Sequence, residues 1–141
     1  MNSKKYDVII IGAGPTGIFT AIEFVKKEKN IDILILEKGT DLEHRVCPMK
    51  ENPGTGCVNC PSCAVVSGWG GAGAFSDGKL SLSPRIGGNL EKYIGEKSLI
   101  EHIEYADDIY MEFGAPERVF GVKGDKLDEI KKKAIKSRLK F

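Results

Sequence analysis

The glycines near the start of the chain have the spacing of a phosphate-binding turn. Gly12, Gly14 and Gly17 form a G-x-G-x-x-G motif directly after the apolar run at residues 8–11. We expect Gly12 to permit a tight turn, Gly14 to let the backbone approach a phosphate, and Gly17 to let a helix pack closely on the strand. The unpaired N–H groups and partial positive charge of a helix N-terminus suit a pyrophosphate. The predicted cofactor-binding turn comprises Gly12, Ala13, Gly14, Pro15, Thr16 and Gly17.

An acidic residue completes this motif. Glu37 stands twenty residues after Gly17, at the end of a second apolar run, where an acid accepts hydrogen bonds from ribose hydroxyls. Its charge disfavours a 2′-phosphate, which argues against NADP at this site. A bare glycine motif is weak evidence, but strand, helix, second strand and terminal acid together favour a nucleotide site over a purely structural turn. FAD and NAD both contain the ADP half, so the motif does not separate them.

The four cysteines form a second group that could carry chemistry. Cys57, Cys60 and Cys63 form C-x2-C-x2-C, and Cys47 lies ten residues upstream, followed by Pro48. Four thiolates could hold zinc or an iron–sulfur cluster. A C-x-x-C pair could instead exchange two electrons with a flavin. Reduced cysteines packed in a loop are the third interpretation, and the spacing leaves all three open.

The elements that position these residues follow from hydrophobic periodicity. Apolar runs predict strands at residues 6–11 and 31–36, and the second run is nearly continuous, as in a strand buried on both faces. Between them an amphipathic helix places Ile18, Ile22 and Val25 on one face. The pattern predicts an α/β fold, a Rossmann-like FAD/NAD(P)-binding fold that is incomplete in this chain.

The rest of the chain is loop-rich and then helical. Residues 39–95 lack sustained helical periodicity and contain a second glycine-rich stretch at 67–80, suited to close contact with an extended cofactor. A capping box from Ser98 to Glu101 predicts the start of one helix, and another is predicted to start near Asp125.

Only two convincing parallel strands are found, so we expect the N-terminal piece of a longer protein. The predicted division is a cofactor-binding unit at residues 1–95 and a helical segment at 96–141 that begins a continuation.

Composition narrows the possible partners. With 21 basic and 20 acidic residues among 141, the chain has no global charge that would attract nucleic acid or an anionic membrane. No apolar stretch approaches the roughly 18 residues of a spanning helix, and the first run is too short for a signal peptide. We expect a cytoplasmic protein whose partner is a small-molecule redox substrate or electron carrier, with cysteines as free thiols or ligands.

Four longer stretches carry a resemblance to a known family. The chain resembles a family of FAD-dependent dehydrogenases, within the flavoprotein group that contains glutathione reductase-like enzymes. The resemblance covers nearly the whole chain, and the third of the stretches is the most specific. They are VIIIGAGPTGIF, ILEKGTDLEHRVCP, SGWGGAGAFSDGKLSLSP and FGAPERVFG.

The resemblance implies FAD as the cofactor. For an FAD-dependent oxidoreductase, NAD(P)H is a candidate electron donor. The resemblance also implies that the first glycines serve the FAD pyrophosphate and that Glu37 serves the adenosine ribose. Lys38 and Arg45 are weaker candidates for contacts nearby. Contacts with the pyrophosphate or flavin end would come from Gly71, Gly73, Ser76 and Asp77. The function implied is the FAD-binding N-terminal portion of a flavin-dependent oxidoreductase, with no assigned catalytic residue. The alternative is a non-catalytic nucleotide- or metal-binding module, or an inactive truncated fragment.

Overall fold

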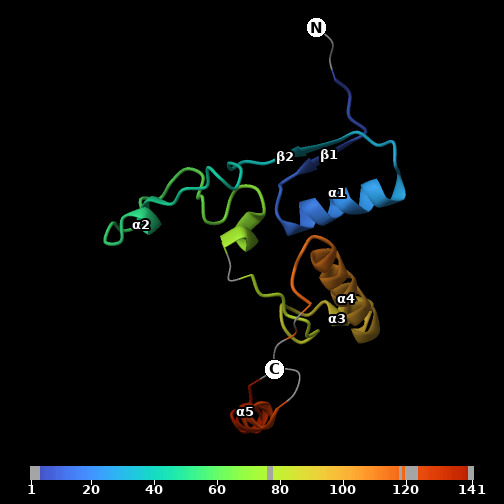
Figure 1. Cartoon of the computed structure of the whole chain (residues 1–141), viewed down its shortest axis with the longest axis vertical. Helices are drawn as coiled ribbons and strands as arrows, with labels where there is room; N and C mark the ends of the chain where they lie inside the picture. Colours follow the sequence, from blue (N-terminus) through green and yellow to red (C-terminus); the bar gives the residue numbers. More distant parts are fainter. Residues whose placement is uncertain (1–3, 76–77, 118, 120–123, 140–141) are drawn as a thin grey trace. The chain divides into compact units, whose positions relative to one another are not determined.

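A parallel βαβ unit opens the computed structural model of the chain. Strand β1 (Val8–Ile11) pairs in parallel with β2 (Ile33–Leu36), and helix α1 (Pro15–Lys27) connects them (Figure 1). The N–H of Gly12 extends the ladder by donating to the carbonyl of Leu36 at 2.7 Å. The mixed α/β class and the predicted βαβ order are therefore confirmed, as a partial Rossmann-like unit. The structure describes residues 4–75, 78–117, 119 and 124–139.

Only one face of this two-stranded sheet is covered by the described residues. Ile10 is buried beneath α1, whereas its neighbours Ile9 and Ile11 are exposed, Ile11 to 86%. The prediction that β2 is buried on both faces is wrong here, since its residues are half-buried and Leu36 is exposed. The predicted apolar face of α1 is also too long, because Val25 is 56% exposed. A single helix covers a single face, so the outward side chains find no second layer.

The remainder of the first compact unit, residues 1–79, is built largely of turns. It contains the short helix α2 (Pro48–Glu51) and the 3₁₀ turn η1 (Gly71–Phe75). The second compact unit spans residues 80–141. This division precedes the one predicted from composition at residue 95, and the assignment of functions to the two segments stays a prediction.

The second unit is helical. It contains α3 (Glu91–Ile94), α4 (Glu96–Glu112) and α5 (Asp125–Lys136), and the predicted start of the last helix is confirmed. The capping box at Ser98 is wrong, because Ser98 lies inside α4. Gly95, at φ 81°, turns the chain directly from α3 into α4 and its carbonyl accepts the N–H of Leu99 at 3.1 Å. None of the helices in the described part of the chain combines the length and apolarity needed to cross a bilayer.

Candidate nucleotide site and cysteine cavity

The first glycine turn has the backbone geometry that the motif predicts. Gly12 has a φ of +100°, in the left-handed region that favours glycine. A Cβ added to Gly17 would overlap the carbonyl oxygen of Gly12 and lie 3.3 Å from Cγ2 of Ile10. The two conformational roles, a tight turn and close packing of helix on strand, are therefore both present.

Gly14 differs from the other two glycines because nothing in the fold requires it. It precedes α1 with an ordinary φ of −74°, and a Cβ placed there would meet no atom within 4 Å. Pro15 is the first residue of α1, as predicted, and Thr16 follows it in the first turn. The open space beside Gly14 lies at the helix N-terminus, where backbone N–H groups and the helix dipole favour an anion.

Ala13 connects this turn to two later segments of the chain. It is fully buried, and its N–H donates to Oε2 of Glu37 at 2.7 Å. Its carbonyl accepts the N–H of Gly70 at 2.8 Å. The turn between β1 and α1 is therefore fixed from both sides by residues more than twenty positions away.

Glu37 is the centre of this arrangement. Its Oε1 accepts the N–H groups of Gly39 and Gly68, each at 2.9 Å, and its Oε2 accepts that of Ala13. The N–H of Ala13, followed by those of Gly39 and Gly68, holds the pKa of the carboxyl below its usual value of 4.5. The backbone N–H of Lys38 also lowers the pKa of this carboxyl, so four backbone N–H groups stabilise its ionised form. The predicted ribose contact stays a prediction, and Lys38 beside it has an exposed side chain.

The second glycine-rich stretch lies against the first. A Cβ added to Gly71, which has a φ of +61°, would lie 3.1 Å from Cα of Gly14 and 3.3 Å from Cδ of Pro15. Gly73 is also near Pro15, at 3.9 Å by the same measure. We call the combined surface of residues 12–17, 37–39 and 68–73 the glycine platform. The predicted contributors Ser76 and Asp77 lie outside the described residues.

The side chain of Arg45 holds the second glycine-rich stretch and the residues before it through hydrogen bonds to their carbonyls. Its side chain is 4% exposed, and its guanidinium donates to four carbonyls: Nε to Ala64 at 2.8 Å, Nη2 to Val65 at 2.9 Å, and Nη1 to Trp69 at 2.8 Å and Gly71 at 2.7 Å. These bonds occupy four of the five guanidinium N–H donors. The sequence suggested a cofactor contact for Arg45, which stays a prediction, and gave no sign of this structural role.

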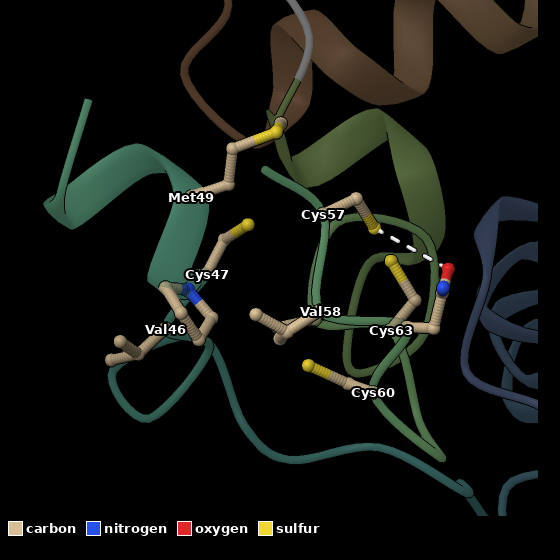
Figure 2. A pocket seen from close by; sticks show the side chains of 10 residues that line it. Val46, Cys47, Met49, Cys57, Val58, Cys60 and Cys63 are labelled. Atoms are coloured by element: carbon tan, nitrogen blue, oxygen red, sulfur yellow. Dashed lines mark hydrogen bonds between the residues drawn. The ribbon is translucent and has the colours of Figure 1, made fainter. Parts of the chain in front are cut away.

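The four cysteines line a separate cavity of about 260 Å³. Figure 2 shows the sulfurs of Cys47 and Cys60 pointing into the space between two chain segments, while Cys57 Sγ donates to Oδ1 of Asn59 at 3.7 Å. All four cysteines are free thiols. Among the described residues, no three Cys, His, Asp or Glu side chains are grouped closely enough to hold a metal ion. We call this space, lined by Cys47, Cys57, Cys60, Cys63, Met49 and Val58, the cysteine cavity.

The two histidines lie on the surface. Nδ1 of His44 is 2.6 Å from Oδ1 of Asp41, and this hydrogen bond lowers the pKa of the Asp41 carboxyl. Nδ1 of His102 is 2.6 Å from the carbonyl oxygen of Ser98, one turn earlier in α4. Both are exposed, as expected for surface or capping residues.

Two curated proteins show partial similarity to this chain. An uncharacterized protein of Clostridium beijerinckii is 37% identical over 73 residues, which cover 52% of this chain and 13% of the relative. The L-2-hydroxyglutarate dehydrogenase, mitochondrial, of Dictyostelium discoideum is 34% identical over 59 residues, 42% of this chain and 12% of the relative. The chain thus spans about an eighth of the length of these relatives. No protein-family model and no solved structure matches it. The similarity to a dehydrogenase is therefore distant and confined to part of each chain.

Proposed function

We propose that this chain is the FAD-binding N-terminal portion of a flavin-dependent oxidoreductase of the dehydrogenase class. The observation that carries the proposal is the contact between the two glycine-rich stretches, with Gly71 against Gly14 and Pro15 at the start of α1. The sequence resemblance assigns both stretches to one FAD molecule. Their meeting at one helix N-terminus is the arrangement that this assignment requires.

The glycine platform has the chemistry to hold the ADP half of the cofactor. Open space beside Gly14 lets a pyrophosphate reach the N-terminus of α1, where the helix dipole offsets its charge. The ionised carboxylate of Glu37, directly after β2, suits a ribose hydroxyl and repels a 2′-phosphate. These residues bind and orient the cofactor.

The choice of FAD over NAD rests on the second stretch. A bare dinucleotide motif serves either cofactor, whereas the SGWGGAGAFSDGKL stretch resembles FAD-dependent dehydrogenases. The partial similarity to a dehydrogenase over 59 residues supports the same class. When bound, the flavin supplies the redox chemistry. NAD(P)H as electron donor, a small-molecule acceptor and a cytoplasmic location complete the proposal.

Titration of the purified chain with FAD tests the proposal, with Gly14→Ala as the decisive variant. The added methyl meets no protein atom within 4 Å, so the fold is expected to persist while the pyrophosphate is obstructed. We expect FAD affinity to fall at least about tenfold, or about 1.4 kcal/mol. Gly56→Ala is the matched control, since a Cβ there also meets nothing and the residue lies outside the platform. Equal FAD affinity in both variants, or no FAD binding by the unaltered chain, contradicts the proposal.

The cysteine cavity favours one alternative, a non-catalytic metal- or nucleotide-binding module. Four thiols gathered at one place are not part of the platform and would serve such a module without a flavin. Metal content without FAD uptake, measured on the same preparation, favours this alternative. Stoichiometric FAD that is reduced by NAD(P)H favours the oxidoreductase.

A further inference from the structure

Every cysteine of the chain lines the same cavity. The sequence contains four cysteines, and all four contribute to the cysteine cavity of about 260 Å³. They come from two segments, residues 46–49, which contain Cys47, and the run from Cys57 to Cys63 (Figure 2). The rest of the described chain holds no thiol, so the fold concentrates all of its sulfur nucleophiles around one space.

Arg45 holds the two cysteine segments together. It stands two residues before Cys47, and its Nε and Nη2 donate to the carbonyls of Ala64 and Val65, directly after Cys63. Turn hydrogen bonds fix the backbone of both outer cysteines. The carbonyl of Cys47 accepts the N–H of Lys50 at 2.9 Å, and that of Cys63 accepts the N–H of Ser67 at 2.8 Å. The thiols are therefore positioned by the same interactions that build the loop.

The C-x2-C-x2-C run bends sharply around the cavity. Asn59, between Cys57 and Cys60, has a φ of +52°, a left-handed conformation in which asparagine is enriched among non-glycine residues. The backbone of the first C-x2-C unit therefore departs from an extended path at Asn59.

Four thiolates can hold a single zinc ion or a larger cluster. A single zinc ion binds sulfur at about 2.3 Å, so its four thiolates converge to within roughly 4 Å of one another. Among the described residues no three Cys, His, Asp or Glu side chains are grouped closely enough to hold a metal ion, so the choice between the two centres rests on the spacing of the cysteines in the sequence. A cubane cluster places its thiolates on four separate irons and fills the space between them. Val58 and Met49 add apolar side chains to the lining of the cavity.

We propose that Cys47, Cys57, Cys60 and Cys63 bind one four-iron, four-sulfur cluster, each thiolate ligating one iron. The C-x2-C-x2-C run matches the spacing of the first three cysteines of the bacterial ferredoxin pattern, and Cys47-Pro48 supplies a Cys-Pro pair that here precedes the run instead of following it. This site is distinct from the glycine platform and does not depend on the flavin proposal. Iron and flavin contents are measured separately, so either proposal can fail alone.

Metal and sulfide analysis of the 141-residue chain tests the cluster. The protein is purified without oxygen, then incubated with ferric iron, sulfide and a thiol reductant, and freed of unbound ions. We expect about four iron and four sulfide per chain, with a paramagnetic signal after reduction by dithionite. One tightly bound zinc per chain with no iron uptake, or no metal at all, overturns the proposal.

Variants of the cavity separate ligation from general effects on the loop. Cys60→Ala is expected to lower the iron content by at least one per chain, because one iron loses its thiolate. Met49→Leu is the matched control: it lines the same cavity with an apolar side chain of similar volume and is expected to keep all the iron. Equal iron loss in the two variants contradicts ligation by Cys60.

Thiol alkylation provides a readout on the unaltered chain, independent of how any variant folds. In the iron-loaded protein all four cysteines are expected to resist alkylation, and removal of the metal by a chelator is expected to expose all four. Cys57, Cys60 and Cys63 are exposed without a bound group, so their protection is a sensitive sign of ligation. Rapid alkylation of all four in the iron-loaded protein overturns the proposal.

Discussion

The glycine platform and the cysteine cavity differ in the groups that they offer to a ligand. The platform presents backbone groups, and its three segments are fixed by the Glu37 carboxylate and the N–H of Gly70. The cavity presents side-chain sulfurs from loops, three of them on exposed residues. The platform is therefore organised by the protein alone, whereas the cavity has its ligating groups gathered but not converged. We expect ligand binding to change the platform little and to order the cavity strongly.

Substitution of Arg45 is expected to have the largest effect, because its side chain supports both the platform and the cysteine loop. Two of its bonds go to the loop after Cys63 and two to the glycine-rich stretch, so Arg45→Met removes support from both regions at once. We expect the free energy of unfolding to fall by about 3 to 5 kcal/mol, since four carbonyls lose a charged donor that is itself buried. Urea unfolding followed by the fluorescence of Trp69, the only tryptophan, measures the change.

Lys50→Met is the control for Arg45. The Lys50 ammonium lies 4.7 Å from the centroid of the Phe75 ring, and the Arg45 guanidinium lies 4.6 Å from the same centroid, but Lys50 is exposed. We expect a change of less than about 1 kcal/mol for Lys50→Met. Similar losses in the two variants would show that the ring contact, and not the carbonyl network, supports the loop.

Gly17→Ala tests whether the platform can be disturbed without changing the cysteine cavity. The new methyl overlaps the Gly12 carbonyl, so helix and strand must separate, at a cost of about 1 to 3 kcal/mol. FAD binding is expected to weaken with stability, whereas the iron content of the cysteine cavity is expected to stay unchanged. Gly14→Ala, which meets no atom, should change stability by less than about 1 kcal/mol. A loss of iron in Gly17→Ala would show that the two regions are not independent.

A smaller effect is expected from protonating Glu37. Because backbone N–H groups lower its pKa in the folded state, its ionised form stabilises the fold fully above the ordinary value of 4.5. This contribution declines as pH falls below 4.5 and is lost below the folded-state pKa. Glu37→Gln lacks that dependence, so the difference in unfolding free energy between the two proteins should shrink with acidification below pH 4.5. A constant difference would contradict the role assigned to the ionised carboxylate.

The smallest effect should come from the exposed pair of Asp41 and His44. The hydrogen bond from His44 lowers the pKa of Asp41, so this stabilisation is present above the ordinary value of 3.8 and lost as pH falls through the lowered pKa. Both side chains are largely exposed, so solvent and salt screen their interaction. His44→Gln should change thermal stability only slightly, and less at high salt. A large, salt-independent change would assign His44 a structural role in the loop.

Local sequence patterns predicted the elements of the platform. The apolar runs and the G-x-G-x-x-G spacing are set by neighbouring residues, and the βαβ unit and the turn at Gly12 follow them closely. The helix predicted to start near Asp125 is also confirmed. Ser98 failed as a cap because Gly95, three residues earlier, had already redirected the chain into α4.

The connections between segments could not be read from the sequence. The bonds of Arg45 reach carbonyls 19 to 26 residues away, and those of Glu37 reach Ala13 and Gly68 at separations of 24 and 31. Such contacts depend on the path of an irregular loop, which has no period to detect. The apolar composition of β2 likewise predicted a covered strand, but burial depends on a second layer that no local pattern specifies.

The long reach of Arg45 has a consequence for the nascent chain. Its last partner, Gly71, is added 26 residues after Arg45, which at about 5 to 20 residues per second takes roughly 1 to 5 s. All four cysteines are added within that interval, before the guanidinium has its full set of carbonyls. The cysteine loop therefore cannot take its folded path until the glycine-rich stretch that follows it has been made. The order of synthesis thus places the thiols in the chain first and the interaction that positions their segments afterwards.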